Sequence, residues 1–122
     1  MEEKVTAQLC EFKPEYFPTL GAKELLIIER RIKALASLCF HLSGKKDFYA
    51  IIDLDGDSVH LRRVGGPVAW QWKYLEQLCL VIAHKLDVKK LTVIADQKFI
   101  RFAIKRMGYK KVDGYLYEKV IA

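Results

Sequence analysis

The stretch RMGYKKVDGYLYEKVI, residues 106–121, decides the fold of this 122-residue chain. A helix is predicted to end at Gly108, because glycine adopts at little cost the positive φ that commonly follows a helix. Two segments rich in aromatic and β-branched residues then flank Asp113-Gly114, a dipeptide typical of a tight hairpin turn. The chain is therefore predicted to close with an ordered β-hairpin, although most chain ends fray into polar residues.

The region before this hairpin predicts two helices separated by a strand. The residues LTVIA at 91–95 form a short unbroken apolar strand, and QKFIRFAIKRM at 97–107 has helical periodicity. A longer helix is predicted from about Ala69 to Lys85, because apolar residues recur there at intervals of three and four. The apolar residues with this spacing are Leu75, Leu78, Cys79, Ile82 and Leu86.

A second hairpin is predicted in the middle of the chain. DFYAIIDL at 47–54 and SVHLRRV at 58–64 are dense in aromatic and β-branched residues and flank the turn-forming Asp-Gly-Asp at 55–57. Asp55 and Asp57 are explained most simply as turn formers. Gly65, Gly66 and Pro67 are expected to end the second strand.

The first third of the chain predicts a strand and a helix. KVTAQLCEF at 4–12 alternates loosely, and PEYFP at 14–18 breaks the pattern with two prolines. Apolar residues spaced by three and four from Ala22 to Leu35 predict a helix that covers a sheet with one face. ASLCFHL at 36–42 fits either an extension of this helix or a strand, and we favour the strand.

Length and composition indicate a single domain spanning residues 1–122, in the α+β class, with a mixed layer of helices over a central sheet. Hydrophobic residues make up 52% and charged residues 30%, as in globular proteins. No apolar run reaches the roughly 20 residues that a membrane span needs, and the start MEEK lacks the features of a secretory signal. A cytoplasmic protein without membrane association is therefore expected.

The formal charge of +6 suggests an acidic partner. The basic residues occur as short pairs spread along the chain, whereas a nucleic-acid footprint more often forms one stripe with interleaved aromatic residues. The charge also suits a cofactor that carries phosphates. A nucleic-acid partner is consequently not expected.

Cysteine and histidine residues do not predict a metal site or a disulfide. Cys10, Cys39 and Cys79 are far apart in sequence, odd in number and set among apolar neighbours, which favours reduced thiols. Neither His41 nor His84 has a partner at metal-ligand spacing.

From about residue 48 to residue 121, the order of predicted elements resembles the GNAT acetyltransferase superfamily. The most specific part is KRMGYKKVDGYLYEKV, which looks like the family's "EKLGF" ending followed by its last strands, with Tyr109 in place of phenylalanine. The resemblance implies a twisted, mostly antiparallel sheet covered by helices on both faces. It also implies an acetyl-CoA or other acyl-CoA cofactor.

The resemblance places this cofactor on the segment from Val59 to Trp70. A pyrophosphate prefers a helix N-terminus, where unpaired N–H groups and the positive end of the helix dipole point outward, and RRVGGPVAW supplies such a corner. The family pattern of Arg or Gln, two residues, Gly, one residue, and Gly or Ala is met at two of three positions, by Arg63 and Gly66 but not by Val68. The expected cofactor-binding residues are Leu61, Arg62, Arg63, Val64, Gly65, Gly66, Val68 and Gln97.

The catalytic groups of the family are incomplete in this chain. Its usual tyrosine, which protonates the departing thiolate, corresponds to Ile104, and isoleucine cannot transfer a proton. Tyr109 and Tyr117 are candidate replacements, although tyrosines in strands are more often packing residues. His60 is a candidate general base, with a structural histidine as the alternative.

Two tryptophans lie at the start of the predicted long helix. One of Trp70 and Trp72 is expected to pack in the core, which leaves the other for a ligand or a partner.

Two functions follow, and the sequence does not decide whether the protein is an enzyme. The first is an acyl-CoA-binding protein that transfers the acyl group to an amine, which a small molecule or a protein would carry. The second is an inactive protein of the same fold used for protein contacts, as a homo-oligomer or with another protein, for example in a virus particle or a regulatory complex.

Overall fold

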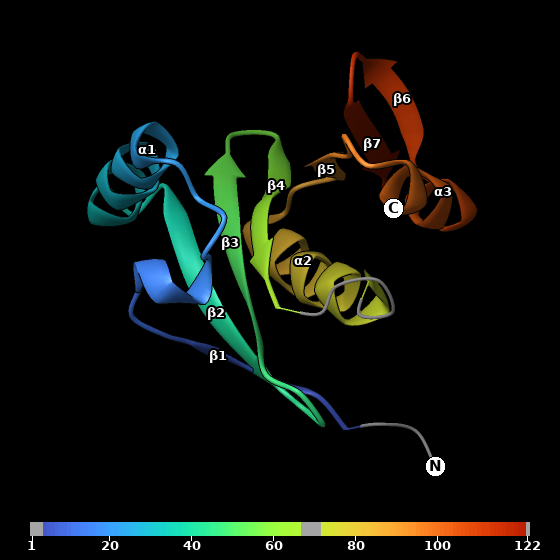
Figure 1. Cartoon of the computed structure of the whole chain (residues 1–122). Helices are drawn as coiled ribbons and strands as arrows, with labels where there is room; N and C mark the ends of the chain where they lie inside the picture. The colour runs from blue at the N-terminus through green and yellow to red at the C-terminus, as the bar shows by residue number, and fades with distance from the viewer. Residues whose placement is uncertain (1–3, 67–71, 122) are drawn as a thin grey trace.

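The computed structural model describes residues 4–66 and 72–121. Seven strands form one sheet in the order β1-β2-β3-β4-β5-β7-β6 (Figure 1). All neighbouring strands are antiparallel except β4 and β5, which run parallel. The strands are β1 (Thr6–Leu9), β2 (Ser37–Ser43), β3 (Phe48–Asp55), β4 (Ser58–Gly65), β5 (Lys90–Ile94), β6 (Lys110–Asp113) and β7 (Leu116–Val120).

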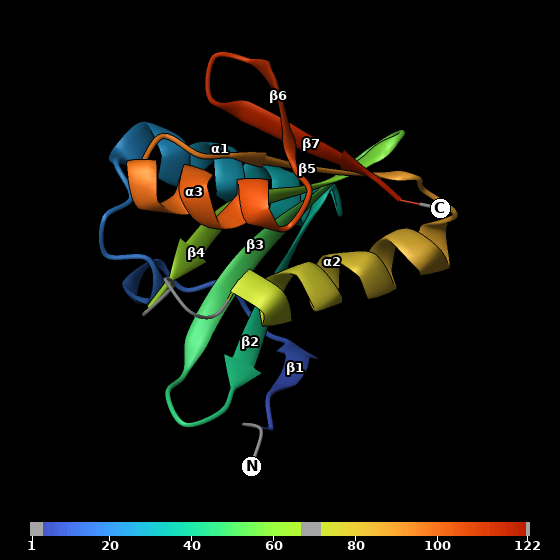
Figure 2. The ribbon, with the colours of Figure 1, turned by 90° about the vertical axis from the view of Figure 1, so that its right-hand side faces the viewer.

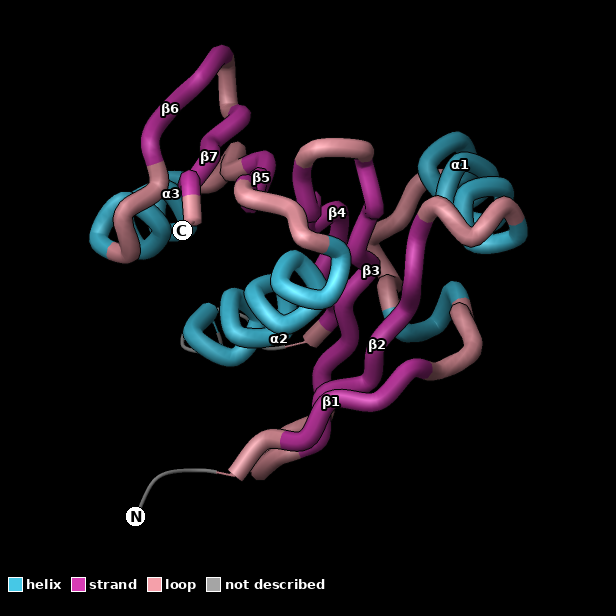
Figure 3. The backbone as a smooth tube through the Cα atoms, turned by 180° about the vertical axis from the view of Figure 1, so that it is seen from behind, coloured by secondary structure: helices cyan, strands magenta, loops and turns pink. Residues whose placement is uncertain are grey.

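Three α-helices and one short 3-10 helix connect the strands. They are η1 (Pro14–Tyr16), α1 (Ala22–Lys33), α2 (Trp72–Leu86) and α3 (Lys98–Arg106). Helices α1 and α2 lie on opposite sides of the central strands (Figure 3), whereas α2 and α3 both face the viewer in Figure 2. The predicted α+β sheet with helices on both faces is therefore confirmed.

Alternation along β3 divides the core into two clusters, because successive strand residues point to opposite faces. Ala50 and Ile52 belong to the larger cluster, which also contains Leu75 of α2 and Ile104 of α3. Ile51 belongs to a smaller cluster beneath α1. The smaller cluster is completed by Phe17, Ile28 and Cys39.

The main elements expected from the sequence are present. Residues 36–42, which fitted either a helix or a strand, form strand β2. Both predicted hairpins are present, as β3–β4 and as β6–β7. The start of the predicted long helix, from Ala69, lies outside the described residues, and α2 continues to Leu86. No helix among the described residues is both long and apolar enough to cross a membrane.

The prediction that Leu35 belongs to the buried face of the first helix is wrong. Helix α1 ends at Lys33, and Leu35 has φ 58° and is 76% exposed. The N–H of Leu35 donates to the carbonyl of Ile32, and the N–H of Ala36 donates to that of Arg31. This is the Schellman arrangement, in which the positive-φ position usually carries glycine. The first predicted strand is also shorter than expected, since only Thr6–Leu9 pair with β2.

Candidate functional site

The two parallel strands β4 and β5 pair over a short length and then separate. Their register joins Val59 to Leu91, His60 to Thr92 and Leu61 to Val93 only. Strand β4 nevertheless continues to Gly65, paired with β3 on its other side. The backbone from 62 to 65 therefore has a strand partner on one side and leaves alternate N–H and C=O groups without strand partners on the other.

A cavity of about 200 Å³ occupies the region where β4 and β5 separate. We call this cavity the β4–β5 cleft. Five expected cofactor residues line it: Leu61, Arg62, Arg63, Val64 and Gln97. The fold thus brings Gln97, which precedes α3, next to a strand more than thirty positions earlier in the chain. Trp72, one of the two tryptophans considered in the sequence, also lines the cleft. The remaining lining residues were not expected, because helix and strand patterns do not show which elements meet in space; they are Thr19, Val93, Ile94, Asp96, Phe99 and Ile100.

Two buried hydrogen-bond donors in the wall of the cleft have no partner among the described residues. They are Nε of Arg63 and Nε1 of Trp72. Native proteins rarely leave such groups unsatisfied, since desolvation without a hydrogen bond is costly. The cleft is therefore suited to a ligand that supplies acceptor oxygens. Trp72 also contacts the larger core cluster, as expected for one of the two tryptophans, whereas Trp70 lies outside the described residues.

The two glycines at the end of β4 are packed against the protein's own chain. A Cβ at Gly65 would lie 1.9 Å from the carbonyl oxygen of Tyr16. Gly66 has φ +108°, and a Cβ there would lie 3.0 Å from Cβ of Phe48. Neither glycine lines the cleft, and Val68 lies outside the described residues. The fold itself therefore requires both glycines, whatever part their amides take in binding.

A buried carboxylate anchors α1 to the sheet. Asp53 on β3 is fully buried and accepts hydrogen bonds from Ser37 Oγ at 2.5 Å and from Arg62 Nε at 2.6 Å. Arg31 of α1 donates to Ser37 Oγ at 2.9 Å and lies 3.3 Å from Asp53. Burial disfavours the charge on Arg62, but hydrogen bonds to Asp53 and Glu24 outweigh it and raise the pKa of its guanidinium. Arg62 is therefore held by the protein itself, which leaves Arg63 as the cleft arginine with an unsatisfied donor.

The candidate base His60 lies on β4 at the last stretch of β4–β5 pairing. Its Nδ1 is 2.7 Å from Oγ1 of Thr92 on β5. Burial is the main cause that lowers the pKa of His60, so the neutral imidazole is favoured. The ring lies on the face opposite Leu61 and does not line the cleft.

The candidate tyrosines also lie outside the lining of the cleft. Tyr117 is 2% exposed and belongs to the larger core cluster. Tyr109 packs against the same cluster, and burial together with the charge of Glu76 raises the pKa of its hydroxyl. Ile104 is fully buried in that cluster. The described structure therefore brings neither tyrosine into the cleft as a proton donor.

Two of the cysteines meet in space despite their separation in sequence. Sγ of Cys10 and Sγ of Cys39 are 3.5 Å apart, and all three cysteines are free thiols. Cys79 is buried separately, in the larger cluster. Within residues 4–66 and 72–121, no group of three potential ligands could hold a metal ion.

A larger cavity, of about 530 Å³, lies away from the cleft, between α2 and strands β1 and β2. Its lining is mostly aliphatic, including Leu9, Leu42 and Val81. It lacks the pair of unsatisfied donors found in the β4–β5 cleft. The smaller cleft is therefore the better candidate for a ligand rich in phosphate and amide oxygens.

Comparison with known proteins gives the fold but no relative by sequence. The chain matches no protein-family model, and no curated protein is similar to it in sequence. Among solved structures, it is similar to an acetyltransferase from Streptococcus agalactiae, with a TM-score of 0.70 and 10% identity over 96% of this chain and 98% of that one. An acetyltransferase from Bacillus subtilis, solved in complex with CoA, gives a TM-score of 0.68 and 12% identity over 98% and 100% of the two chains.

A third similar structure is a putative acetyltransferase of the GNAT family from Desulfovibrio desulfuricans. Its TM-score is 0.62, with 12% identity over 98% of this chain and all of that one. The likeness covers nearly the full length of each protein, so the chain has the GNAT fold.

Proposed function

We propose that this protein binds an acyl-CoA in the β4–β5 cleft. The observation that carries the proposal is that two side chains lining the same cleft, those of Arg63 and Trp72, each hold a buried donor, Nε and Nε1, without a partner among the described residues. A CoA molecule supplies pyrophosphate and amide oxygens that satisfy such donors. The CoA-bound B. subtilis protein with the same fold supports this choice of ligand.

The free edge of β4 fits the extended part of such a ligand. Among the described residues, the segment from 62 to 65 has no strand partner on the cleft side, so its N–H and C=O groups can pair with the two amides of a pantetheine arm. The apolar side chains of Leu61 and Val93 lie where the strands meet and suit the acyl end. Trp72 opens the described part of helix α2, so the positive end of the helix dipole lies on this side and favours the phosphates.

We further propose that the protein transfers the acyl group from the bound acyl-CoA to an amine. The reaction needs a base that accepts the ammonium proton before the amine attacks the thioester carbonyl. His60 is the residue that we propose for this role, because its neutral form is favoured and it lies one residue before the last β4–β5 pair, that of Leu61 with Val93. An acceptor would reach it from the α1 face of the sheet.

An inactive protein of the same fold is the second candidate. Ile104 occupies the position of the family's proton-donating tyrosine, and the described lining of the cleft contains no tyrosine, histidine or cysteine. A protein of this kind would hold the cofactor, or a similar ligand, without chemistry.

Calorimetry with acetyl-CoA tests the binding proposal. A ligand present at about 100 times its dissociation constant stabilises the fold by about 2.7 kcal/mol, which a thermal melt detects. Arg63→Met, which removes the unsatisfied donor, is expected to weaken binding about tenfold, whereas Arg30→Met on α1 is the matched control. No melting shift at millimolar acetyl-CoA would overturn the proposal, and equal affinities for the two variants would move the ligand away from Arg63.

Release of free CoA thiol in the presence of amines then separates the two candidates. An enzyme releases thiol in an amine-dependent manner, and His60→Ala suppresses that release while retaining acetyl-CoA binding. Binding without amine-dependent release supports the inactive protein.

A further inference from the structure

The net positive charge of the chain is concentrated in one short segment. Residues 96–111 contain six basic residues and one acidic residue, Asp96, and thus hold +5 of the total formal charge of +6. This segment comprises α3 and the start of β6. The six basic residues are Lys98, Arg101, Lys105, Arg106, Lys110 and Lys111.

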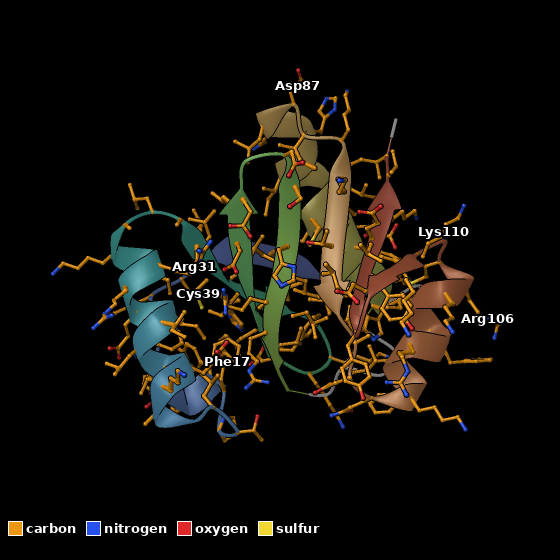
Figure 4. The ribbon with its side chains drawn as sticks, turned by 90° about the horizontal axis from the view of Figure 1, so that it is seen from above. Phe17, Arg31, Cys39, Asp87, Arg106 and Lys110 are labelled. Carbon is orange, nitrogen blue, oxygen red and sulfur yellow. The ribbon has the colours of Figure 1, made fainter. Side chains whose placement is uncertain are left out.

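These charges are not neutralised within the described part of the chain. None of the six forms a salt bridge with a described carboxylate, and all are exposed except Arg101, which is half-buried. Arg31 and Arg62 on the other side of the molecule are instead paired with Asp53. Figure 4 shows Arg106 and Lys110 together at one edge, remote from Arg31. The charge that the protein presents to a partner therefore lies mainly around α3.

The exposed large aromatic residues of the described chain lie on this same surface. Phe99, Phe102 and Tyr115 are 54%, 65% and 55% exposed. Arg106 lies over the ring of Phe102 at 5.6 Å, and Arg101 lies over the ring of Tyr115 at 5.4 Å. Cations and flat rings are therefore interleaved.

Helical periodicity explains why these side chains share a face. Ile104 is buried, and Ile100, Ala103 and Met107 pack against the larger core cluster, so the inner stripe of α3 is occupied. The outer stripe, at spacings of three and four, consists of Lys98, Phe99, Phe102, Lys105 and Arg106. We call this outer stripe, together with Tyr115, Lys110 and Lys111, the α3 surface.

We propose that the α3 surface binds single-stranded nucleic acid. Phosphates of the strand would pair with the unneutralised lysines and arginines, and unpaired bases would stack on Phe99, Phe102 and Tyr115. A duplex offers phosphates but keeps its base faces stacked, so it makes only the first kind of contact. The excess of basic residues from 96 to 111 can be counted in the sequence, whereas the fold shows that they share a surface with the three exposed aromatic rings.

Fluorescence anisotropy with a labelled 12-nucleotide single-stranded RNA, the same sequence as DNA, and the corresponding duplex tests this proposal. Both single strands are expected to bind at least fivefold more tightly than the duplex at 50 mM salt. The logarithm of the association constant should fall linearly with the logarithm of salt concentration. An excess of CoA should weaken oligonucleotide binding by less than threefold, since Phe99 is the one residue that the α3 surface shares with the lining of the cleft.

Paired variants separate the two kinds of contact. Phe99→Ala with Phe102→Ala is expected to weaken single-strand binding about tenfold with an unchanged salt slope. Lys105→Glu with Arg106→Glu should reduce both the affinity and the slope. Lys23→Glu with Lys33→Glu, two exposed α1 lysines, gives the same change in net charge and should affect binding by less than threefold.

Several outcomes would overturn the proposal. These are no binding at 50 mM salt, equal losses in the α1 and α3 charge variants, or single-strand affinity unaffected by loss of the phenylalanines. Displacement by CoA would assign the surface to the cofactor. Binding to anionic lipid vesicles or to an acidic peptide instead of the oligonucleotides would assign it to another class of partner.

Discussion

Gly65 and Tyr16 are in backbone contact, since a Cβ built on Gly65 would lie 1.9 Å from the carbonyl oxygen of Tyr16. The same hypothetical atom would lie 3.1 Å from a ring carbon of Phe17. The contact holds the segment before α1 against the end of β4, beside the β4–β5 cleft. A glycine that a sequence pattern assigns to a cofactor is thus required for internal packing.

Gly65→Ala is expected to lower the free energy of unfolding by at least about 2 kcal/mol, because backbone atoms cannot move aside as a flexible side chain can. Gly21→Ala is the control, since no atom lies within 4 Å of a Cβ there and its φ is −76°. The control should change stability by less than about 0.5 kcal/mol. Urea unfolding measures both, and equal effects would contradict the contact.

Asp53→Asn is expected to destabilise the protein by about 3 kcal/mol, because it removes a buried charge that Arg62 and Arg31 share. Asp57→Asn, in the exposed β3–β4 turn, should cost less than about 0.5 kcal/mol. A chemical denaturation series on the two variants gives this comparison. Similar losses would show that the buried network contributes no more than a surface carboxylate.

Cys10 and Cys39 are expected to form a disulfide with oxidised glutathione. A thiolate attacks the glutathione disulfide and releases one glutathione, and the neighbouring thiol then displaces the second. Burial, followed by the contact with Cys10, raises the pKa of Cys39 to about 12, so the second step should accelerate with rising pH. In the chain-entropy model the disulfide stabilises the folded protein by about 3.5 kcal/mol.

Mass spectrometry after alkylation checks the prediction, with one disulfide and a single alkylated thiol at Cys79 expected. Cys10→Ser should prevent the disulfide. Persistence of three alkylated thiols after prolonged oxidation at pH 9 would contradict it.

Protonation of His60 is expected to destabilise the fold. Its pKa is lowered in the native state, chiefly by burial, so the unfolded chain binds the proton more readily. Above the ordinary histidine pKa of about 6.5, the neutral ring of His60 makes its full contribution to the free energy of unfolding. That contribution is lost as the pH falls through the lower pKa that His60 has in the folded protein. The unfolding free energy of wild type minus that of His60→Gln should therefore decrease from pH 7.5 to pH 5, and a constant difference would contradict this.

Much of the fold could be predicted because its signals are local. The aromatic and β-branched residues before and after the turn at 55–57 predicted β3 and β4, and Gly108 with Asp113-Gly114 predicted the end of α3 and the last hairpin. Leu35 was misassigned because a helix cap depends on φ, and an apolar residue at helical spacing gives no sign of it.

The site was predictable only in part, since it depends on which elements meet. The residues from Leu61 to Val64 were expected next to a ligand and line the cleft, together with Gln97. The role of Asp53 was missed because its partners lie on three other elements and at no fixed spacing. The proximity of Cys10 to Cys39 was missed for a similar reason, because it follows from the β1–β2 register.

The brief pairing of β4 with β5 makes the sheet two smaller sheets joined at one narrow junction. On one side β1 to β4 are held by long ladders, and on the other side β5 to β7 form a compact ribbon. Three residue pairs and the bond from His60 to Thr92 connect them along the strands. A ligand bound in the cleft would take the place of the hydrogen bonds that β4 and β5 do not make beyond their last pair. We therefore expect ligand binding to rigidify the junction between the two halves of the sheet, and not the protein as a whole.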